Sequence, residues 1–214
     1  MQPPNAGQPW RPPADLSAGV SSIAFHPGEA NSLAVGYVDG RLELYDVASG
    51  ADVTPPFVSP RPGTITRLAF SSDGEWLAVV EPNIIHTINL NDGRERSALQ
   101  IEGGTVDTLM FSPDGETLIT GMLDGSIVLW DLTSGRRLGT LHGHAGPIMA
   151  LALDPDDQTL ASGGLDTAVV LWRIDEEEWA RLACHMAGRN LSPDEWKRYF
   201  GEVEQTLTCP PATH

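Results

Sequence analysis

The sequence is poor in cysteine and in basic residues, and each shortage narrows the range of functions. Its 214 residues include two cysteines, Cys184 and Cys209. Two cysteines form neither a disulfide framework nor a complete zinc site, so we expect reduced thiols in a cytoplasmic protein, with a Cys184–Cys209 bridge as the alternative. Thirteen basic residues stand against 29 acidic ones, a net charge of −16. Because nucleic acids and anionic membranes are bound through Lys and Arg, we expect neither as a partner.

Long apolar runs and ligand-binding loops are also missing. No stretch approaches the run of about eighteen apolar residues that a membrane span needs, and the first residues lack the basic and apolar regions of a secretory signal. There is no Gly-rich phosphate loop, no calcium-binding loop and no exposed nucleophile turn of the Gly-X-Ser-X-Gly kind. We therefore expect no catalytic residue, no metal and no cofactor.

The sequence does contain one pattern repeated four times. An aromatic or aliphatic residue precedes a tight turn at steps of 45, 41 and 42 residues, as Phe25, Phe70, Phe111 and Leu153. A second position, about twenty residues further on, recurs as Tyr45-Asp46, Ile88-Asn89, Trp130-Asp131 and Trp172-Arg173. Two positions in step at this period predict a repeat architecture. Alternating apolar runs between Pro-Asp-Gly, Asp-Gly and Ser-Gly turns predict four strands per repeat, the fourth of them weaker.

These repeats resemble the tryptophan–aspartate (WD) repeat family of β-propellers over about residues 18–174. The fourth repeat matches best, and the resemblance implies a buried hydrogen-bond chain in it, made of His144, Ser162, Asp166 and Trp172. In the third repeat the resemblance implies the same role for Thr120, Asp124 and Trp130. A buried indole N–H needs an acceptor, which a hydroxyl supplies. His, Ser and Asp are also the residue types of a hydrolase triad, but Ser162 lies in mid-strand, so we interpret the chain as structural.

The other repeats depart from this pattern. The third has Gly103-Gly104 in place of Gly-His, and the first offers Tyr45 in place of tryptophan. The second has lost the turn aspartate, reading Glu81-Pro82-Asn83. We therefore expect the second repeat to depend on packing alone and to be the weakest of the four.

The two ends differ in composition from the repeats. Residues 1–17 contain five prolines and predict a flexible arm. In residues 175–214, Trp179, Leu182 and Met186 lie on one helical face, and Ser192-Pro193-Asp194-Glu195 is a helix start, so we expect two helices. This tail resembles the helical C-terminal appendix of large bacterial WD-repeat proteins, which often carry a STAND-type nucleotide-binding or kinase-like domain.

The predicted fold is thus all-β: a partial β-propeller of about four four-stranded blades over residues 18–174, followed by a two-helix appendix. Propellers of this family usually have seven blades. The fourth blade lacks a fourth strand of its own, for which residues 9–13 are the matching donor. We expect the chain to be the C-terminal part of a longer propeller, with a four-repeat chain that associates with itself through open blade edges as the alternative.

The leading functional hypothesis is a non-catalytic scaffold that binds a protein or peptide partner. The resemblance implies that the partner contacts one rim of the propeller, formed here by Val38, Leu123, Leu165, Asp107 and Met149. The alternative is a sensor or regulatory portion of a larger bacterial signalling protein, a STAND NTPase or kinase. A propeller hydrolase or lyase is a more distant third.

Overall fold

The computed structural model describes residues 18–29, 31–55, 63–154 and 158–174. The chain divides into two compact units: Met1–Ala152 with Ala161–Val170, and Leu153–Leu160 with Leu171–His214. The predicted arm and the predicted helical appendix, with both cysteines, lie outside the described residues.

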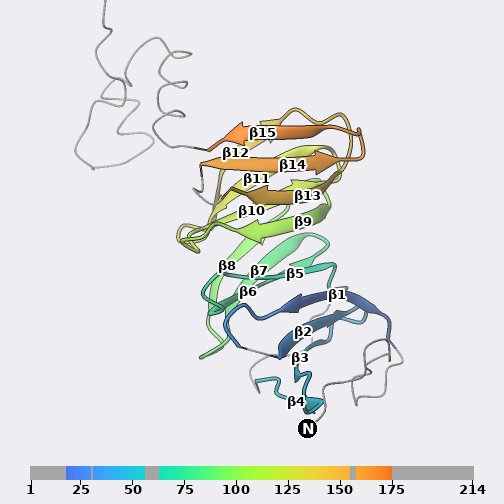
Figure 1. The fold of residues 1–214 in the computed structure, drawn as a ribbon, viewed down its shortest axis with the longest axis vertical. Helices are drawn as coiled ribbons and strands as arrows, with labels where there is room; N and C mark the ends of the chain where they lie inside the picture. Colours follow the sequence, from blue (N-terminus) through green and yellow to red (C-terminus); the bar gives the residue numbers. More distant parts are fainter. Residues whose placement is uncertain (1–17, 30, 56–62, 155–157, 175–214) are drawn as a thin grey trace, which may run out of the picture. The chain divides into compact units, whose positions relative to one another are not determined.

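The strands form antiparallel sheets in which neighbours follow chain order (Figure 1). The first sheet contains β1 (Val20–Phe25), β2 (Ser32–Tyr37), β3 (Leu42–Asp46) and β4 (Ala51–Asp52). The second contains β5 (Arg67–Phe70), β6 (Trp76–Glu81), β7 (Ile84–Asn89) and β8 (Glu95–Gln100). The third contains β9 (Val106–Phe111), β10 (Thr117–Met122), β11 (Ser126–Asp131) and β12 (Arg136–His142). The last is three-stranded among the described residues, with β13 (Ile148–Leu153), β14 (Thr159–Gly164) and β15 (Val169–Arg173).

The two positions that define the repeat fall at the same places in every sheet. The first is the last residue of the first strand, at Phe25, Phe70, Phe111 and Leu153. The second closes the third strand, at Asp46, Asn89, Asp131 and Arg173. The repeat predicted from the sequence is therefore confirmed as four equivalent sheets, and the four-stranded blade is confirmed for the first three.

The turn after each first strand is held by its own side chains. In the third repeat the Ser112 hydroxyl donates to the Asp114 carboxylate at 2.5 Å, and the backbone N–H groups of Glu116 and Thr117 donate to Asp114 and Ser112. Gly115 adopts a φ of 69°, which is unfavourable for residues with a Cβ. The Ser-Pro-Asp-Gly sequence thus specifies a tight hairpin through local hydrogen bonds.

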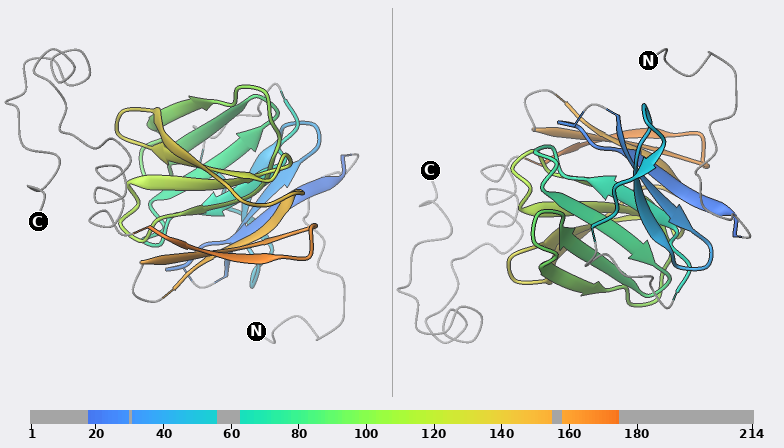
Figure 2. Two further views of the ribbon diagram at one scale, coloured as in Figure 1. Left: turned by 90° about the horizontal axis from the view of Figure 1, so that it is seen from above. Right: turned by 90° about the horizontal axis from the view of Figure 1, so that it is seen from below.

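The first three sheets pack face to face, and their strands carry the usual twist (Figure 2). Their first strands β1, β5 and β9 are neighbours in space. One apolar cluster joins the first and second sheets and includes Leu44, Ile65 and Leu77. Another joins the second and third and includes Leu99 and Trp130. Each sheet therefore buries its faces against the next repeat, as expected for repeat units that lack a core of their own.

A close approach between sheets recurs at two glycines. A Cβ added to Gly36 would lie 2.7 Å from the Cγ2 atom of Ile65, and one added to Gly121 would lie 2.7 Å from that of Ile148. Ile65 and Ile148 are fully buried there. The glycines are needed at these places because the isoleucine that leads into the next sheet occupies the space.

Candidate functional site: buried polar chains and an apolar rim

His144, Ser162 and Asp166 form a continuous hydrogen-bonded chain. His144 lies in the loop before β13, Ser162 on β14, and Asp166 in the turn that follows β14. The His144 Nδ1 atom lies 2.9 Å from one Asp166 oxygen and 3.0 Å from the other, and its Nε2 atom lies 2.8 Å from the Ser162 hydroxyl. Three of the four predicted members are therefore in contact, and the fourth, Trp172, lies on β15.

Asp166 is the anchor of this chain. Besides His144, it accepts the backbone N–H groups of Ala145 at 2.8 Å and Ala168 at 3.1 Å. The hydrogen bond from His144, with these two N–H donors, lowers the pKa of Asp166 to about 2. One carboxylate thus ties the entry loop of the repeat to its second turn, which is a structural task.

The hydrogen-bonded chain of His144, Ser162 and Asp166 does not have the geometry of a hydrolase site. The Ser162 side chain is buried, and its hydroxyl lies 3.5 Å from the Val170 carbonyl oxygen. A catalytic serine must reach a substrate carbonyl. A serine enclosed in a strand by its own sheet supports the structural interpretation.

In the third sheet the hydrogen-bonded chain has fewer members than expected. Trp130 donates its indole N–H to the Thr120 hydroxyl at 3.0 Å, and that hydroxyl donates to the Val128 carbonyl. Asp124, predicted as a third member, instead accepts the hydroxyl of Ser126 at 2.6 Å, which lowers the pKa of Asp124. Where the fourth repeat has His144, this repeat has Gly104, so no imidazole joins Asp124 to Thr120.

The first two sheets contain polar contacts that the sequence did not reveal. In the first, the Tyr45 hydroxyl donates to Glu43, and the Arg41 guanidinium lies 4.6 Å from the centre of the Tyr37 ring. Burial raises the pKa values of Tyr37 and Tyr45. Tyrosine thus takes the place of the tryptophan chain in this repeat.

In the second sheet a buried hydroxyl pair joins Thr87 to Ser97 at 2.8 Å, and the buried carboxylate of Glu81 lies 3.6 Å from His86 Nε2. The expectation that this repeat depends on packing alone was therefore wrong. The signal that could have revealed the pair was the single hydroxyl residue in each of the two adjacent strands, Thr87 in β7 and Ser97 in β8. That the second repeat is the weakest stays a prediction.

The predicted rim residues of the turns occupy equivalent positions. Val38, Leu123 and Leu165 each follow the second strand of a sheet, and their side chains are 47%, 49% and 65% exposed. Their backbone N–H groups donate to the carbonyls of residues 19, 105 and 147, at 3.0, 2.9 and 2.8 Å. Sequence reasoning missed the exposed Pro82, which stands at this place in the second sheet. We call Val38, Pro82, Leu123 and Leu165 the apolar rim.

The two predicted rim residues on first strands differ from each other. Met149 is exposed on β13. Asp107, on β9, is mostly buried and forms an ion pair with Arg67 of β5 at 2.6 Å. This carboxylate is thus engaged between two neighbouring first strands, so it is not an open acidic contact point for a partner.

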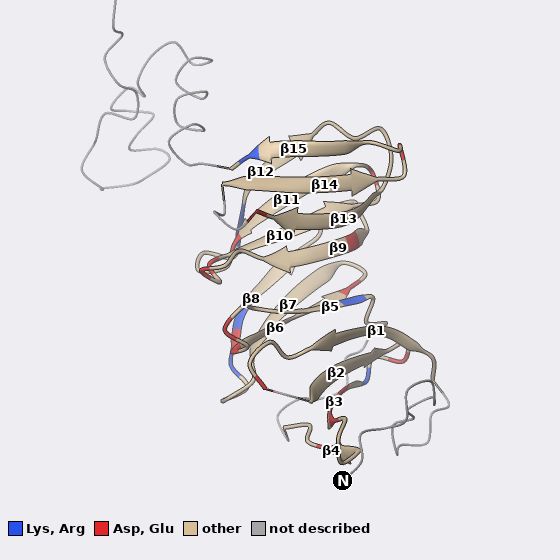
Figure 3. Ribbon diagram, viewed as in Figure 1, with Lys and Arg blue, Asp and Glu red and all other residues tan. Residues whose placement is uncertain are grey.

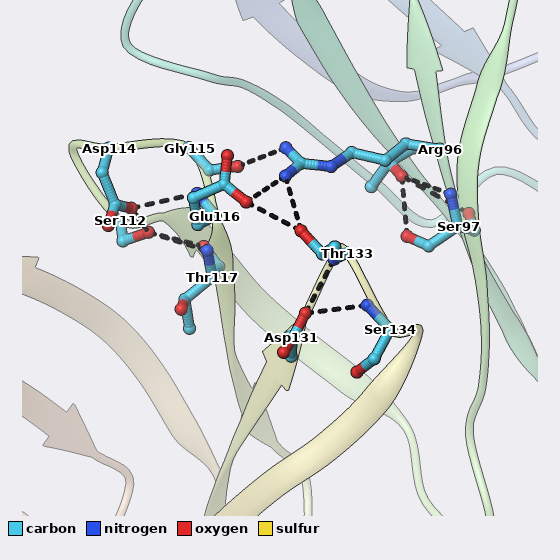
Figure 4. A network of polar contacts seen from close by, with 11 residues as sticks. Arg96, Ser97, Ser112, Asp114, Gly115, Glu116, Thr117, Asp131, Thr133 and Ser134 are labelled. Carbon is cyan, nitrogen blue, oxygen red and sulfur yellow. Dashed lines mark hydrogen bonds and ion pairs between the residues drawn. The ribbon is translucent and has the colours of Figure 1, made fainter. Parts of the chain in front are cut away.

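A second polar network lies between the second and third sheets (Figure 4). Arg96 of β8 donates to the Gly115 carbonyl at 2.8 Å and to the Thr133 hydroxyl at 3.1 Å, and it pairs with Glu116. Its guanidinium also lies 5.5 Å from the centre of the Trp76 ring. One arginine therefore connects its own sheet to both turns at the same end of the next sheet.

The surface of the described residues is acidic and offers no metal site. Acidic residues of the described part lie mainly in turns at the ends of strands, whereas basic residues are few (Figure 3). Within residues 18–29, 31–55, 63–154 and 158–174, no group of three His, Cys, Asp or Glu side chains could hold a metal ion. In that part of the chain no helix is long and apolar enough to cross a bilayer.

Comparison with known proteins finds a family model that matches part of the chain. The family model "WD domain, G-beta repeat" matches residues 98–131 and 135–173. WD repeat-containing protein 1 of Gallus gallus is 31% identical over 121 residues, which is 56% of this chain and 20% of that protein. Periodic tryptophan protein 2 of Saccharomyces cerevisiae is 29% identical over 119 residues, 55% of this chain and 13% of that protein. The chain therefore matches a fifth or less of the length of these relatives. They are eukaryotic, so the expected likeness to bacterial proteins stays a prediction.

Solved structures agree on the fold. The computationally designed Ika4 protein superposes with a TM-score of 0.60 at 22% identity, over 74% of this chain and 93% of its own. The designed Ika8 protein gives a TM-score of 0.59 at 23% identity, over 72% of this chain and 46% of its own. At these identities the likeness concerns the arrangement of strands alone.

Proposed function

Because residues 98–131 and 135–173 match the WD-repeat family model, we propose that the chain is a non-catalytic scaffold that holds a protein partner against the apolar rim. WD repeats generally serve as protein-interaction scaffolds. The observation that supports this surface is the exposure of an apolar side chain at one equivalent turn position in four successive repeats.

The backbone makes the rim a rigid surface. The turns of Val38, Leu123 and Leu165 are each fixed by the same hydrogen bond to the loop that enters their own sheet. Side chains on fixed turns lose little conformational entropy when a partner covers them. Single exposed aliphatic residues are common on soluble proteins, but four in register present a repeated apolar contact.

The partner that fits this surface is a protein segment with apolar side chains of its own. The carboxylates of Asp39, Asp124 and Asp166, next to the rim residues, are occupied by Arg41, Ser126 and His144. Their hydrogen-bonding capacity is thus largely used within the turns. Recognition at the rim therefore rests on apolar contact more than on ion pairing.

The test is a capture experiment with a matched control. The double variant Leu123→Asp/Leu165→Asp places two charges on the rim, and the double variant Leu138→Asp/Val53→Asp places two charges on exposed residues outside it. We expect proteins that are captured by the unmodified chain to be lost with the rim variant and kept with the control variant. The free energy of unfolding of each variant should lie within about 0.5 kcal/mol of that of the unmodified chain, because all four positions are exposed. Equal capture by the two variants would rule out the apolar rim as the binding surface.

A further inference from the structure

The contacts between sheets use a repeated knob and hole. The knob is the apolar residue at, or just before, the start of each first strand: Val20, Ile65, Val106 and Ile148. The hole lies at a glycine of the second strand in three of the four sheets: Gly36, Gly121 and Gly163. Ile65 fills the hole at Gly36 and Ile148 fills the hole at Gly121, each with its Cγ2 atom 2.7 Å from where a Cβ would be.

The hole at Gly163 is empty. Among the described residues, no heavy atom other than those of the two chain neighbours of Gly163 lies within 4 Å of the position that a Cβ would take there. Val169 stands at the place where the earlier sheets have Leu42 and Ile127, which pair with Gly36 and Gly121 across the sheet. Those two side chains are buried, whereas Val169 is 74% exposed. The sequence thus provides a sheet-packing surface at Gly163 and Val169 that none of the described residues occupies.

The matching knob at the other end of the repeats is also free. Val20 is 51% exposed and Ile23 is 58% exposed, although their equivalents Ile65 and Leu68 are buried against the preceding sheet. Among the described residues, the chain therefore presents one unpaired knob and one unpaired hole, and the two are complementary in the way that the internal contacts show.

We propose that a second copy of this chain fills the hole, with its Val20 and Ile23 packing on Gly163 and Val169. This surface is distinct from the apolar rim, so the inference is independent of the proposed function. The contact is head-to-tail, since it joins different surfaces of the two copies. Such contacts close into a ring if the rotation per copy allows it, and otherwise continue as an open chain.

One residue restricts how the second copy approaches. In the third sheet, a Cβ on Gly125 would lie 2.7 Å from the His144 carbonyl oxygen of the next loop. The equivalent residue in the fourth repeat is Thr167, which has a side chain. The loop that precedes the incoming strand must therefore lie farther from this turn than in the internal contacts.

The experiment measures the solution mass of the purified chain by light scattering across a concentration series. We expect the mass to rise from 23.0 kDa towards at least twice that value as concentration increases. Gly163→Ile fills the hole, and Val169→Asp places a charge beside it. The double variant Val20→Asp/Ile23→Asp removes the knob. Each variant should stay at 23.0 kDa at all concentrations, while Leu138→Asp, a change on exposed β12, should associate like the unmodified chain.

Mixing the variants separates this contact from general adhesion. The Gly163→Ile chain keeps an intact knob, and the Val20→Asp/Ile23→Asp chain keeps an intact hole. An equimolar mixture should therefore recover a species of about twice 23.0 kDa that neither variant forms alone. A monomeric unmodified chain, as expected if its own segments or further blades cover the hole, would overturn the proposal. So would association that survives in the variants, or a mixture that stays monomeric.

Discussion

At the scale of single residues, the best-defined feature is the pair of His144 and Asp166. Their contact links two loops that are 22 positions apart in the chain. The pKa of Asp166 is lowered to about 2 from an ordinary value of 3.8, because His144 and backbone N–H groups stabilise the carboxylate. A group with a depressed pKa in the folded state stabilises the fold above its unfolded pKa and loses that contribution as pH falls.

We therefore predict that Asp166→Asn lowers the free energy of unfolding at neutral pH, and that the difference from the unmodified chain narrows between pH 3.8 and about pH 2. Asparagine has no negative charge, so it stabilises the hydrogen bonds from His144 and the two backbone N–H groups less than the carboxylate does. Urea unfolding at a series of pH values measures the difference. Glu102→Gln, at an exposed loop position, serves as the control and should track the unmodified chain. A difference for Asp166→Asn that stays constant down to pH 2 would contradict this account.

At the scale of the elements, the sequence predicted most of the strands but few of the contacts between them. Turn residues such as Asp114 and Gly115 act locally, so their spacing alone located the hairpins. The His144–Ser162–Asp166 chain was predictable because a family pattern carries it. The contacts of Arg96 were not, because an arginine at one end of a repeat gives no sign of which turns of the next repeat it will reach.

The contacts of Arg96 predict that this side chain helps to hold the second and third sheets together. We expect Arg96→Met to lower the free energy of unfolding by about 1–2 kcal/mol, because it removes charge-assisted hydrogen bonds to the neighbouring turns. Arg94→Met is the matched control: it lies two residues away, and its side chain is 83% exposed, so its loss should cost at most about 0.5 kcal/mol. Chemical denaturation of both variants measures the contrast. Equal losses would show that the Arg96 network adds nothing beyond an ordinary surface charge.

At the scale of the whole molecule, the composition predicted the acidic character but not which of the packing positions between sheets are filled. The net charge follows directly from 29 acidic and 13 basic residues. The empty hole at Gly163 could not be recognised from the sequence, since a glycine in a strand does not reveal whether a neighbour fills the space beside it. The knob residues are likewise ordinary apolar residues until their burial is compared from sheet to sheet.

The net charge predicts how the free energy of unfolding depends on salt concentration. A net charge of −16 repels itself more strongly in the folded chain than in the expanded unfolded chain, so it opposes folding. Raising NaCl from roughly 10 mM to roughly 200 mM shortens the screening length from about 30 Å to less than 10 Å. Salt also weakens ion pairs such as Arg67–Asp107, but with more than twice as many acids as bases the repulsive pairs outnumber the attractive ones. We therefore expect the free energy of unfolding to rise with NaCl, and the same trend with KCl as the control for a specific ion effect. A fall in the free energy of unfolding over this range would show that attraction within ion pairs outweighs repulsion among the acidic residues.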